Sequence, residues 1–156
     1  MKRIRMLVMD VDGTLTDGKI YIGAQGELMK AFNAKDGYGI VRFISEGGIP
    51  VIITGRSSDI VTRRSEELGI RELYQKVTDK LAQLKNTAEK YGITADEIAY
   101  IGDDLNDLKC MEYCGLTAYP GDAAKEICDK VNYICKKNGG EGAVREYLDW
   151  MREKGY

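Results

Sequence analysis

Apolar residues of this chain gather in short, nearly uninterrupted runs, and stretches with helical spacing lie between them. The clear runs are Ile4–Met9, Pro50–Thr54 and Ile98–Gly102, and the weaker ones are Leu116–Tyr119, Val131–Ile134 and Glu72–Tyr74. Uninterrupted apolar runs are typical of strands that are covered on both faces, as in a parallel sheet. The pattern therefore predicts a parallel sheet buried between helices.

Helical spacing recurs between the runs, over Gly37–Ser45, Asp59–Leu68, Asp79–Tyr91, Leu105–Tyr113, Asp122–Val131 and Glu141–Lys154. This alternation predicts the α/β class, a three-layer, doubly wound parallel sheet of Rossmann-like type. No linker or repeat divides the chain, so we expect a single domain over residues 1–156. Residues 19–32 break the pattern, and their Gly-flanked turn at Gly23–Gly26 predicts a β-hairpin inserted after the first strand.

Composition narrows the possible functions. The chain has no histidine, which excludes His-based triads, His-ligated zinc and His general bases. A net charge of −2 gives no basic surface for nucleic acid, so we expect no nucleic-acid partner. No apolar run is long enough to span a membrane, so we expect no membrane partner. The N-terminus lacks a signal-peptide pattern, so we expect a cytoplasmic protein. We expect the cysteines to be reduced and buried; they are Cys110, Cys114, Cys128 and Cys135.

Polar clusters directly follow the three clear strands. They are Asp10–Thr14, Thr54–Ser58 and Gly102–Asp107. In a doubly wound sheet the ligand crevice lies beyond the carboxyl ends of the strands. We therefore expect these three clusters to converge at one edge of the sheet.

Five carboxylates would meet in that crevice: Asp10, Asp12, Asp103, Asp104 and Asp107. Any one of them alone is explained by a helix cap or a turn. Together they would repel one another strongly, and a hard divalent cation resolves the conflict. Ligand sets made only of oxygen favour Mg²⁺.

A phosphate cradle is the second predicted feature. Thr54 and Gly55 end a strand and open a helix, where backbone N–H groups attract anions. Lys80 at the start of another helix is unfavourable for the helix dipole, but beside a phosphate its charge is useful. Carboxylates, a metal, an N–H cradle and a lysine together suit phosphoryl transfer, in which an aspartate can serve as the nucleophile.

Four sequence motifs carry a resemblance to a known family. The D-x-D-G-T run at residues 10–14, Thr54, Lys80 and the G-D-D-x-x-D run at 102–107 resemble the motifs of the haloacid dehalogenase superfamily, in its capless group. The resemblance implies that fold and a phosphoric monoester hydrolase. It implies that Asp10 is the nucleophile that becomes an aspartyl-phosphate and that Asp12 is the acid and base.

The same resemblance implies a ligand set. Mg²⁺ would be held by Asp10, the backbone carbonyl of Asp12 and Asp103. Asp104 and Asp107 would orient metal-bound waters and Lys80. Thr54, Gly55 and Lys80 would hold the phosphoryl oxygens.

Longer segments suggest the substrate class. Residues 10–18, 32–40, 53–58 and 139–146 resemble the phosphatases of 2-keto-3-deoxy sugar acid phosphates, which implies 3-deoxy-D-manno-octulosonate (KDO) 8-phosphate, or alternatively a nine-carbon sialic-acid-type 9-phosphate. Arg56 is the candidate for binding the sugar carboxylate, and in this resemblance it favours the eight-carbon acid. Weaker candidates are Asn33, Ser57 and Arg64; Arg64 and its neighbour Arg63 also suit an exposed helix surface. Relatives often have Gln-Gly before the motif lysine, whereas Gln75 is followed here by Lys76.

The chain leaves no room for a cap domain over the site. The resemblance therefore implies a homotetramer in which a neighbouring subunit covers the site, the hairpins associate and the stretch Gly139–Gly142 reaches an adjacent site. A plain loop before a helix explains those glycines equally well.

Two other functions stay open. A receiver-type signalling domain would place its phosphorylated aspartate after the third strand, and a catalytically silent binding or scaffold domain would usually have lost a motif residue.

Overall fold

A parallel sheet forms the centre of the molecule. The computed structural model describes residues 3–127 and 131–156, and within them six strands pair in the order β5-β4-β1-β6-β7-β8. Their bounds are β1 Met6–Met9, β4 Ile49–Ile53, β5 Glu72–Tyr74, β6 Ile98–Ile101, β7 Leu116–Tyr119 and β8 Tyr133–Ile134. Every pairing in this sheet is parallel. The predicted α/β class and doubly wound sheet are confirmed.

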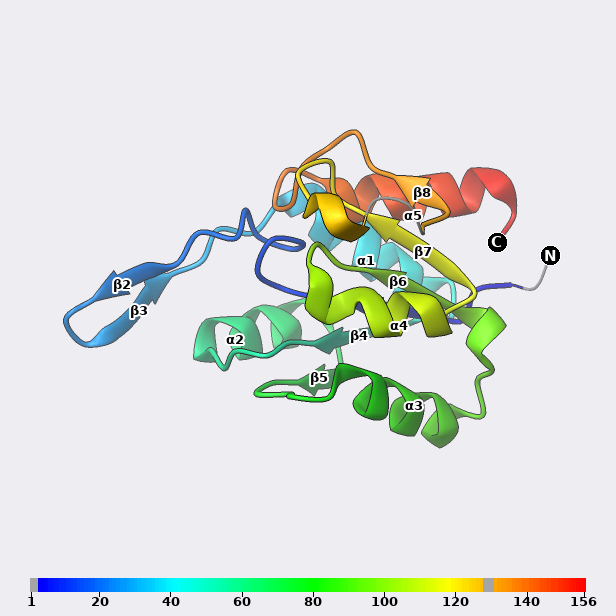
Figure 1. Ribbon diagram of the computed structural model, residues 1–156, viewed down its shortest axis with the longest axis horizontal. Helices are drawn as coiled ribbons and strands as arrows, with labels where there is room; N and C mark the ends of the chain where they lie inside the picture. Colours follow the sequence, from blue (N-terminus) through cyan, green and yellow to red (C-terminus); the bar gives the residue numbers. More distant parts are fainter. Residues whose placement is uncertain (1–2, 128–130) are drawn as a thin grey trace.

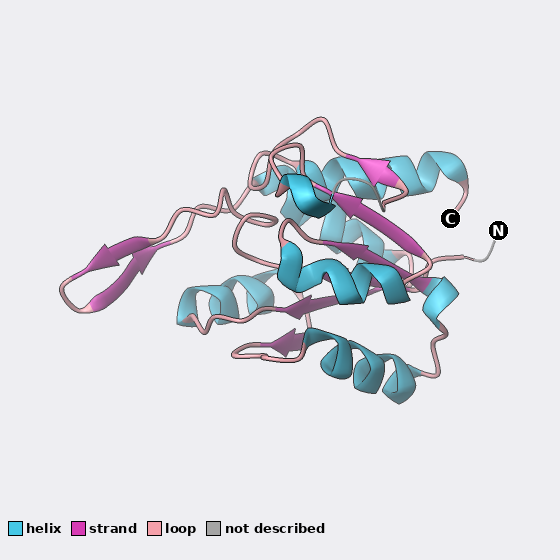
Figure 2. Cartoon of the chain, viewed as in Figure 1, coloured by secondary structure: helices cyan, strands magenta, loops and turns pink. Residues whose placement is uncertain are grey.

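Helices cover both faces of this sheet (Figures 1 and 2). The α-helices of the described residues are α1 Ala34–Ser45, α2 Asp59–Leu68, α3 Lys80–Tyr91, α4 Leu108–Tyr113 and α5 Ala143–Lys154. Alternate residues of β1 point to opposite faces, as the pleat requires. Leu7 and Met9 join the core beneath α1, α2 and α5, whereas Met6 and Val8 join the core beneath α3 and α4.

One predicted helix differs from the structure. The described part of Asp122–Val131 forms a turn and a short 3₁₀ helix at Lys125–Ile127, and residues 128–130 lie outside the described residues. The backbone here is tied to other segments, because Gly121 donates to the carbonyl of Lys137 and Ala124 donates to that of Asp103. These tertiary hydrogen bonds override the local helical pattern. A second 3₁₀ helix, Leu105–Asp107, precedes α4.

The predicted hairpin is present and stands away from the rest of the molecule (Figure 1). Strands β2 (Tyr21–Gly23) and β3 (Gly26–Met29) are antiparallel. Ile22 and Leu28 expose 71% and 66% of their surface, which is unusual for large apolar side chains of a monomer. The hairpin therefore presents apolar surface to solvent.

Among the described cysteines, Cys110 and Cys135 are buried, Cys114 is half-buried, and all three thiols are free. Cys128 lies outside the described residues. In residues 3–127 and 131–156 we find no helix with the length and apolar character needed to cross a membrane.

Candidate active site

The loops that follow β1, β4 and β6 meet at the carboxyl edge of the sheet. Asp10 follows β1 and donates its N–H to the carbonyl of Ile101 at the end of β6. Thr54 follows β4, is buried, and donates its N–H to Tyr74 of β5. The register of the sheet thus brings the predicted polar clusters to one place.

Three carboxylates crowd together at this edge. One oxygen each from Asp10, Asp103 and Asp107 lies within 4.8 Å of the others. Burial raises the pKa of Asp10 to about 6, and the charge of Asp107 contributes to this rise. The pKa of Asp103 is raised to about 8 by burial and by the charge of Asp10. A divalent cation would relieve both effects, so the chemistry of this trio fits Mg²⁺.

Lys80 is buried among these acids. Its Nζ lies 2.9 Å from Oδ1 of Asp10 and 2.8 Å from Oδ1 of Asp107. Burial alone lowers the pKa of Lys80, but the two carboxylates outweigh it and raise that pKa above its ordinary value. Asp79 caps α3 by accepting from the N–H of Ala82, so the helix starts with Lys80 facing inward. The ammonium offsets part of the negative charge of the trio.

Asp107 is fully occupied by protein donors. Its Oδ1 also accepts from the Tyr100 hydroxyl at 2.6 Å, and its Oδ2 accepts from the N–H groups of Asp103 and Asp104 at 3.1 and 3.4 Å. Asp107 is therefore built to hold Lys80 and the motif loop, which leaves Asp10 and Asp103 as the carboxylates available to an ion. Asp104 is exposed, and its carboxylate accepts from the N–H of Leu105.

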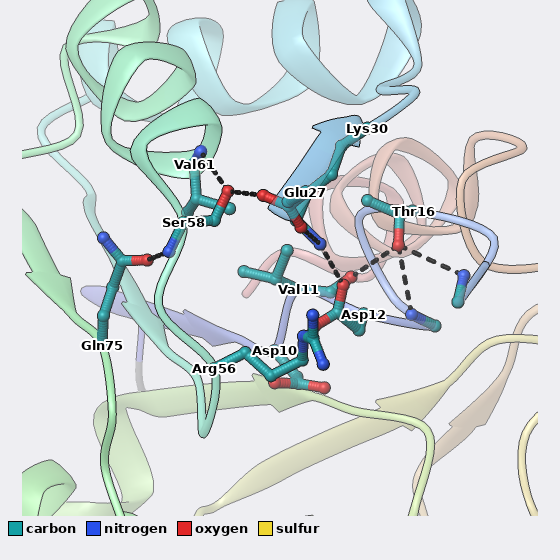
Figure 3. A network of polar contacts seen from close by, with 12 residues as sticks. Asp10, Val11, Asp12, Thr16, Glu27, Lys30, Arg56, Ser58, Val61 and Gln75 are labelled. Carbon is teal, nitrogen blue, oxygen red and sulfur yellow. Dashed lines mark hydrogen bonds and ion pairs between the residues drawn. The ribbon is translucent and has the colours of Figure 1, made fainter. Parts of the chain in front are cut away.

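The carboxylate of Asp12 points to Lys30 of the hairpin and away from the carboxylate of Asp10 (Figure 3). Its Oδ1 accepts from Nζ of Lys30 at 2.6 Å, and its Oδ2 lies 3.5 Å from Nε of Arg56. The next residue, Gly13, has φ 90°, and a Cβ there would lie 2.0 Å from Oδ2 of Asp103. Glycine is therefore required where the Asp12 loop passes under Asp103.

The segment after β4 combines buried and exposed groups. Ser58 is buried and caps α2 by accepting from the N–H of Val61, whereas Gly55, Arg56 and Ser57 are exposed. Ser57 lines a cavity of about 310 Å³ between this segment and the hairpin. Arg56 thus lies at the exposed side of Asp12, whereas Ser57 lines a hollow that includes none of the acidic trio.

Asn33 and Arg64, also predicted as substrate candidates, are engaged elsewhere. Asn33 caps α1 by accepting from the N–H of Lys35, and its amide donates to the carbonyl of Gly140. Arg64 pairs with Glu67 at 2.9 Å and lies over the ring of Phe32. Both side chains stabilise the start of α1 and the base of the hairpin.

The glycine stretch packs against its own chain. A Cβ on Gly139 would lie 1.9 Å from the carbonyl oxygen of Gly13, and Gly140 donates its N–H to Thr14. Only glycine permits such a close approach of two backbones. In this structure the two glycines support the loop that carries Asp12. The reach of Gly139–Gly142 to an adjacent site, which the resemblance implies, stays a prediction.

Lys76 stands where relatives often have the glycine of a Gln-Gly pair. Its φ of 56° is in the left-handed region that a glycine would adopt easily. The turn is kept, and Gln75 beside it accepts from the N–H of Ser58 and donates to Thr62. The substitution thus leaves the backbone path to Lys80 intact.

Comparison with known proteins places the chain in a family. Residues 58–148 match the model of the haloacid dehalogenase-like hydrolases. The chain belongs to that family. This hydrolase is 43% identical to the KDO 8-phosphate phosphatase KdsC of Escherichia coli K12 over 150 residues, which are 96% of this chain and 80% of that protein.

Solved structures agree with that assignment. A crystal structure of the KDO 8-phosphate phosphatase from Moraxella catarrhalis, in complex with magnesium, phosphate and KDO, has a TM-score of 0.93 and 41% identity, covering 96% of this hydrolase and 86% of that chain. The cobalt-bound phosphatase from Haemophilus influenzae has a TM-score of 0.94 and 34% identity, covering 97% and 88%.

Lys30 was not singled out by the sequence, although it contacts Asp12. A lysine at the end of a hairpin strand has no motif of its own. The one nearby signal is the opposite charge of Glu27, three residues earlier, with which Lys30 pairs. Such a pair of charges is common on exposed strands and does not indicate a site. Only the fold of the hairpin against the β1 loop gives Lys30 its place.

Proposed function

We propose that this hydrolase is an Mg²⁺-dependent phosphatase that converts KDO 8-phosphate to KDO and phosphate. The observation that carries the proposal is the set formed by buried Asp10, Asp107 and Lys80 with half-buried Asp103, at the carboxyl edge of the sheet near Asp12. The KdsC relatives named above support the substrate, and the magnesium in the M. catarrhalis complex supports the metal.

Asp10 is the proposed nucleophile. Its oxygen attacks phosphorus, an aspartyl-phosphate bond forms, and the bond from phosphorus to the sugar oxygen breaks. Thr54, Gly55 and Lys80 hold the phosphoryl oxygens, with Lys80 already 2.9 Å from Asp10. Mg²⁺ would be held by the carboxylates of Asp10 and Asp103 and the backbone carbonyl of Asp12, and when bound it neutralises charge on the phosphoryl group. Asp107 and Asp104 orient Lys80 and metal-bound waters.

Asp12 is the proposed acid and base. It gives its proton to the departing sugar oxygen and then takes a proton from the water that attacks the aspartyl-phosphate. The second attack breaks the bond from Asp10 to phosphorus and releases phosphate. Asp12 ends the cycle protonated, as it began.

Arg56 is the proposed contact for the sugar carboxylate. Its side chain is half exposed and lies beside Asp12, at the open side of the site. A guanidinium binds a carboxylate with two parallel hydrogen bonds. Ser57 at the adjoining cavity is a further candidate, and Asn33 and Arg64 are the weaker ones.

We propose one phosphatase domain over residues 1–156 that works as a cytoplasmic homotetramer. The apolar side chains of Ile22, Leu28 and Met29 on the projecting hairpin support association with other copies. A neighbouring subunit over the open side of the site would exclude water, which strengthens the electrostatic contacts within it.

The test is phosphate release from KDO 8-phosphate, a nine-carbon acid 9-phosphate and a hexose phosphate, with Asp10→Asn as the control. We expect KDO 8-phosphate to lead by about 100-fold in kcat/KM, activity to depend on Mg²⁺, and Asp10→Asn to abolish it. A lead for the nine-carbon acid would keep the mechanism and overturn the substrate and the use of Arg56. No turnover of any ester would favour the silent binding domain.

A further inference from the structure

We propose that Lys30 of the hairpin is a positioning residue that reserves Oδ2 of Asp12 for proton transfer by holding Oδ1. This inference rests on the proposed function, because it assigns the oxygen through which Asp12 acts. It also gives the hairpin a direct part in the chemistry of its own subunit.

The contact between Lys30 and Asp12 is short and sheltered. Nζ of Lys30 lies 2.6 Å from Oδ1 of Asp12, and the lysine side chain is only 2% exposed. Burial lowers the pKa of Lys30, but hydrogen bonds to Asp12 and Glu27 outweigh burial and raise that pKa above its usual value. The lysine therefore stays charged and keeps its hydrogen bond to Oδ1.

The lysine is itself held from behind. Oε1 of Glu27 lies 2.9 Å from Nζ of Lys30, and its Oε2 accepts from the Ser58 hydroxyl at the start of α2 (Figure 3). Gln75 in turn accepts from the N–H of Ser58 at 2.7 Å. A line of polar contacts thus runs from the loop before α3, through α2 and the hairpin, to Asp12.

The two oxygens of Asp12 have different surroundings. Oδ1 is bound by the buried Lys30, whereas Oδ2 is 3.5 Å from Arg56, whose side chain is 50% exposed. Because Lys30 holds Oδ1, Oδ2 is the oxygen that the proposal assigns to proton transfer. From Oδ2 the proton passes to the sugar oxygen as the bond to phosphorus breaks, and Oδ2 later receives the proton of the attacking water.

Two substrates with different leaving groups can distinguish a positioning role of Lys30 from a merely structural one. A sugar alkoxide needs a proton in order to leave, but p-nitrophenolate does not. The parameter kcat/KM reports only the steps up to leaving-group release, so the later water attack does not confuse it. In Lys30→Met we expect kcat/KM to fall about 100-fold for KDO 8-phosphate and less than about 5-fold for p-nitrophenyl phosphate. Lys30→Arg should restore part of the loss.

Two further variants keep the test decisive. Glu27→Gln leaves Lys30 in place and removes its support, so we expect the same difference between the esters at about 10-fold, even if Lys30→Met does not fold. Lys19→Met is the matched control, since Lys19 is an exposed lysine of the same hairpin that pairs with Asp17. Equal losses on both esters, or no loss, would overturn the inference while the wild-type activity upholds the phosphatase. A wild type that hydrolyses neither ester would overturn both.

Discussion

At the scale of single residues, Asp107 determines how the acidic trio is arranged. It accepts from Lys80, Tyr100 and two backbone N–H groups, and it is completely buried. A Cβ at Gly102 would lie 2.4 Å from its carboxylate, so the loop is shaped around this side chain. Asp104, three residues earlier, is exposed and caps a short 3₁₀ turn.

Asp107→Asn and Asp104→Asn form a matched pair. The first removes a charge partner of buried Lys80, so we expect a loss of about 3 kcal/mol in the free energy of unfolding and of 10- to 100-fold in kcat/KM. The second leaves an equivalent cap, so we expect changes below about 0.5 kcal/mol and about 3-fold. Urea unfolding and steady-state kinetics measure both. Equal effects of the two substitutions would contradict the arrangement described here.

Asp36, at the start of α1, also has a buried carboxylate. One of its oxygens accepts from the N–H of Arg145, and the other has no hydrogen-bond partner in the described part of the chain. Burial raises the pKa of Asp36 from 3.8 to about 6. The folded protein thus holds this proton more tightly than the unfolded chain does.

Stability should therefore fall as pH rises from about 4 to above 6, by about 3 kcal/mol from this group. Asp36→Asn removes this dependence, so we expect the variant to match the wild type near pH 4 and to be more stable at pH 8. Urea unfolding in saturating Mg²⁺ measures the difference, with exposed Asp59→Asn as the control. A constant difference between variant and wild type from pH 4 to 8 would contradict the assignment.

Which residues could be predicted depends on how they are placed. Asp10, Thr54 and Asp103 follow apolar runs directly, so the parallel sheet alone determines where they meet. Lys30 lies at the end of the hairpin and Tyr100 lies within β6. Neither residue directly follows an apolar run, which is the sequence signal that identified the other site residues. The contacts of Lys30 and Tyr100 depend on side-chain packing between distant segments, which no local pattern encodes.

At the scale of elements, the loop after β1 depends on the glycines before α5. Gly139 lies against Gly13, and Gly140 donates to Thr14, so two backbones touch beside Asp12. Thr16 holds the same loop from within, since its Oγ1 accepts from the N–H of Gly18 and donates to Val11 (Figure 3). The position of Asp12 is thus set by contacts between elements.

Gly139→Ala should disturb this contact. A Cβ would overlap the carbonyl of Gly13, so we expect a loss of about 3 kcal/mol in the free energy of unfolding and about 100-fold in kcat. Gly92→Ala is the control, because Gly92 has φ 59° with open space around it. Its cost should be about 1 kcal/mol with unchanged kcat. Thermal unfolding and single-turnover assays measure both, and wild-type activity in the Gly139→Ala variant would contradict the proposed support.

Elements built from continuous apolar runs were predicted well, because burial on both faces leaves a clear record in the sequence. The hairpin was found from its glycines and its place in the chain. The segment from Asp122 was not, because its backbone bonds to Asp103 and Lys137 and follows them instead of its own helical spacing. The 3₁₀ turn at Leu105–Asp107 has a different cause: its side chains cap it locally, and the carboxylate of Asp107 is held by Lys80 and Tyr100.

At the scale of the whole molecule, the hairpin is the element whose apolar side chains a single copy leaves exposed. Ile22, Leu28 and Met29 are more than half exposed on it, while Lys30 at its base is buried against Asp12. The same element thus offers an apolar surface outward and a charged group inward. The proposed assembly and the proposed role of Lys30 would thus depend on the same element.

Replacing Ile22 and Leu28 together by Glu should convert the proposed tetramer to monomers. Both side chains lie outside the two cores, so we expect the free energy of unfolding of the monomer to stay within about 1 kcal/mol of the wild type. Val41→Glu is the control, an exposed apolar residue of α1 that is 45% accessible. Sedimentation velocity measures the mass. A tetramer that survives both charges would contradict association through the hairpin.

The central place of β1 in the sheet has a consequence for synthesis of the protein. Met6–Met9 is synthesised before both of its neighbours in the sheet, because β4 and β6 end at residues 53 and 101. At about 5 to 20 residues per second, this apolar strand waits roughly 5 to 20 seconds for its second neighbour. Asp10 and Asp103 thus come together only after β6 has emerged, and until then the apolar strand Met6–Met9 lacks its second neighbour.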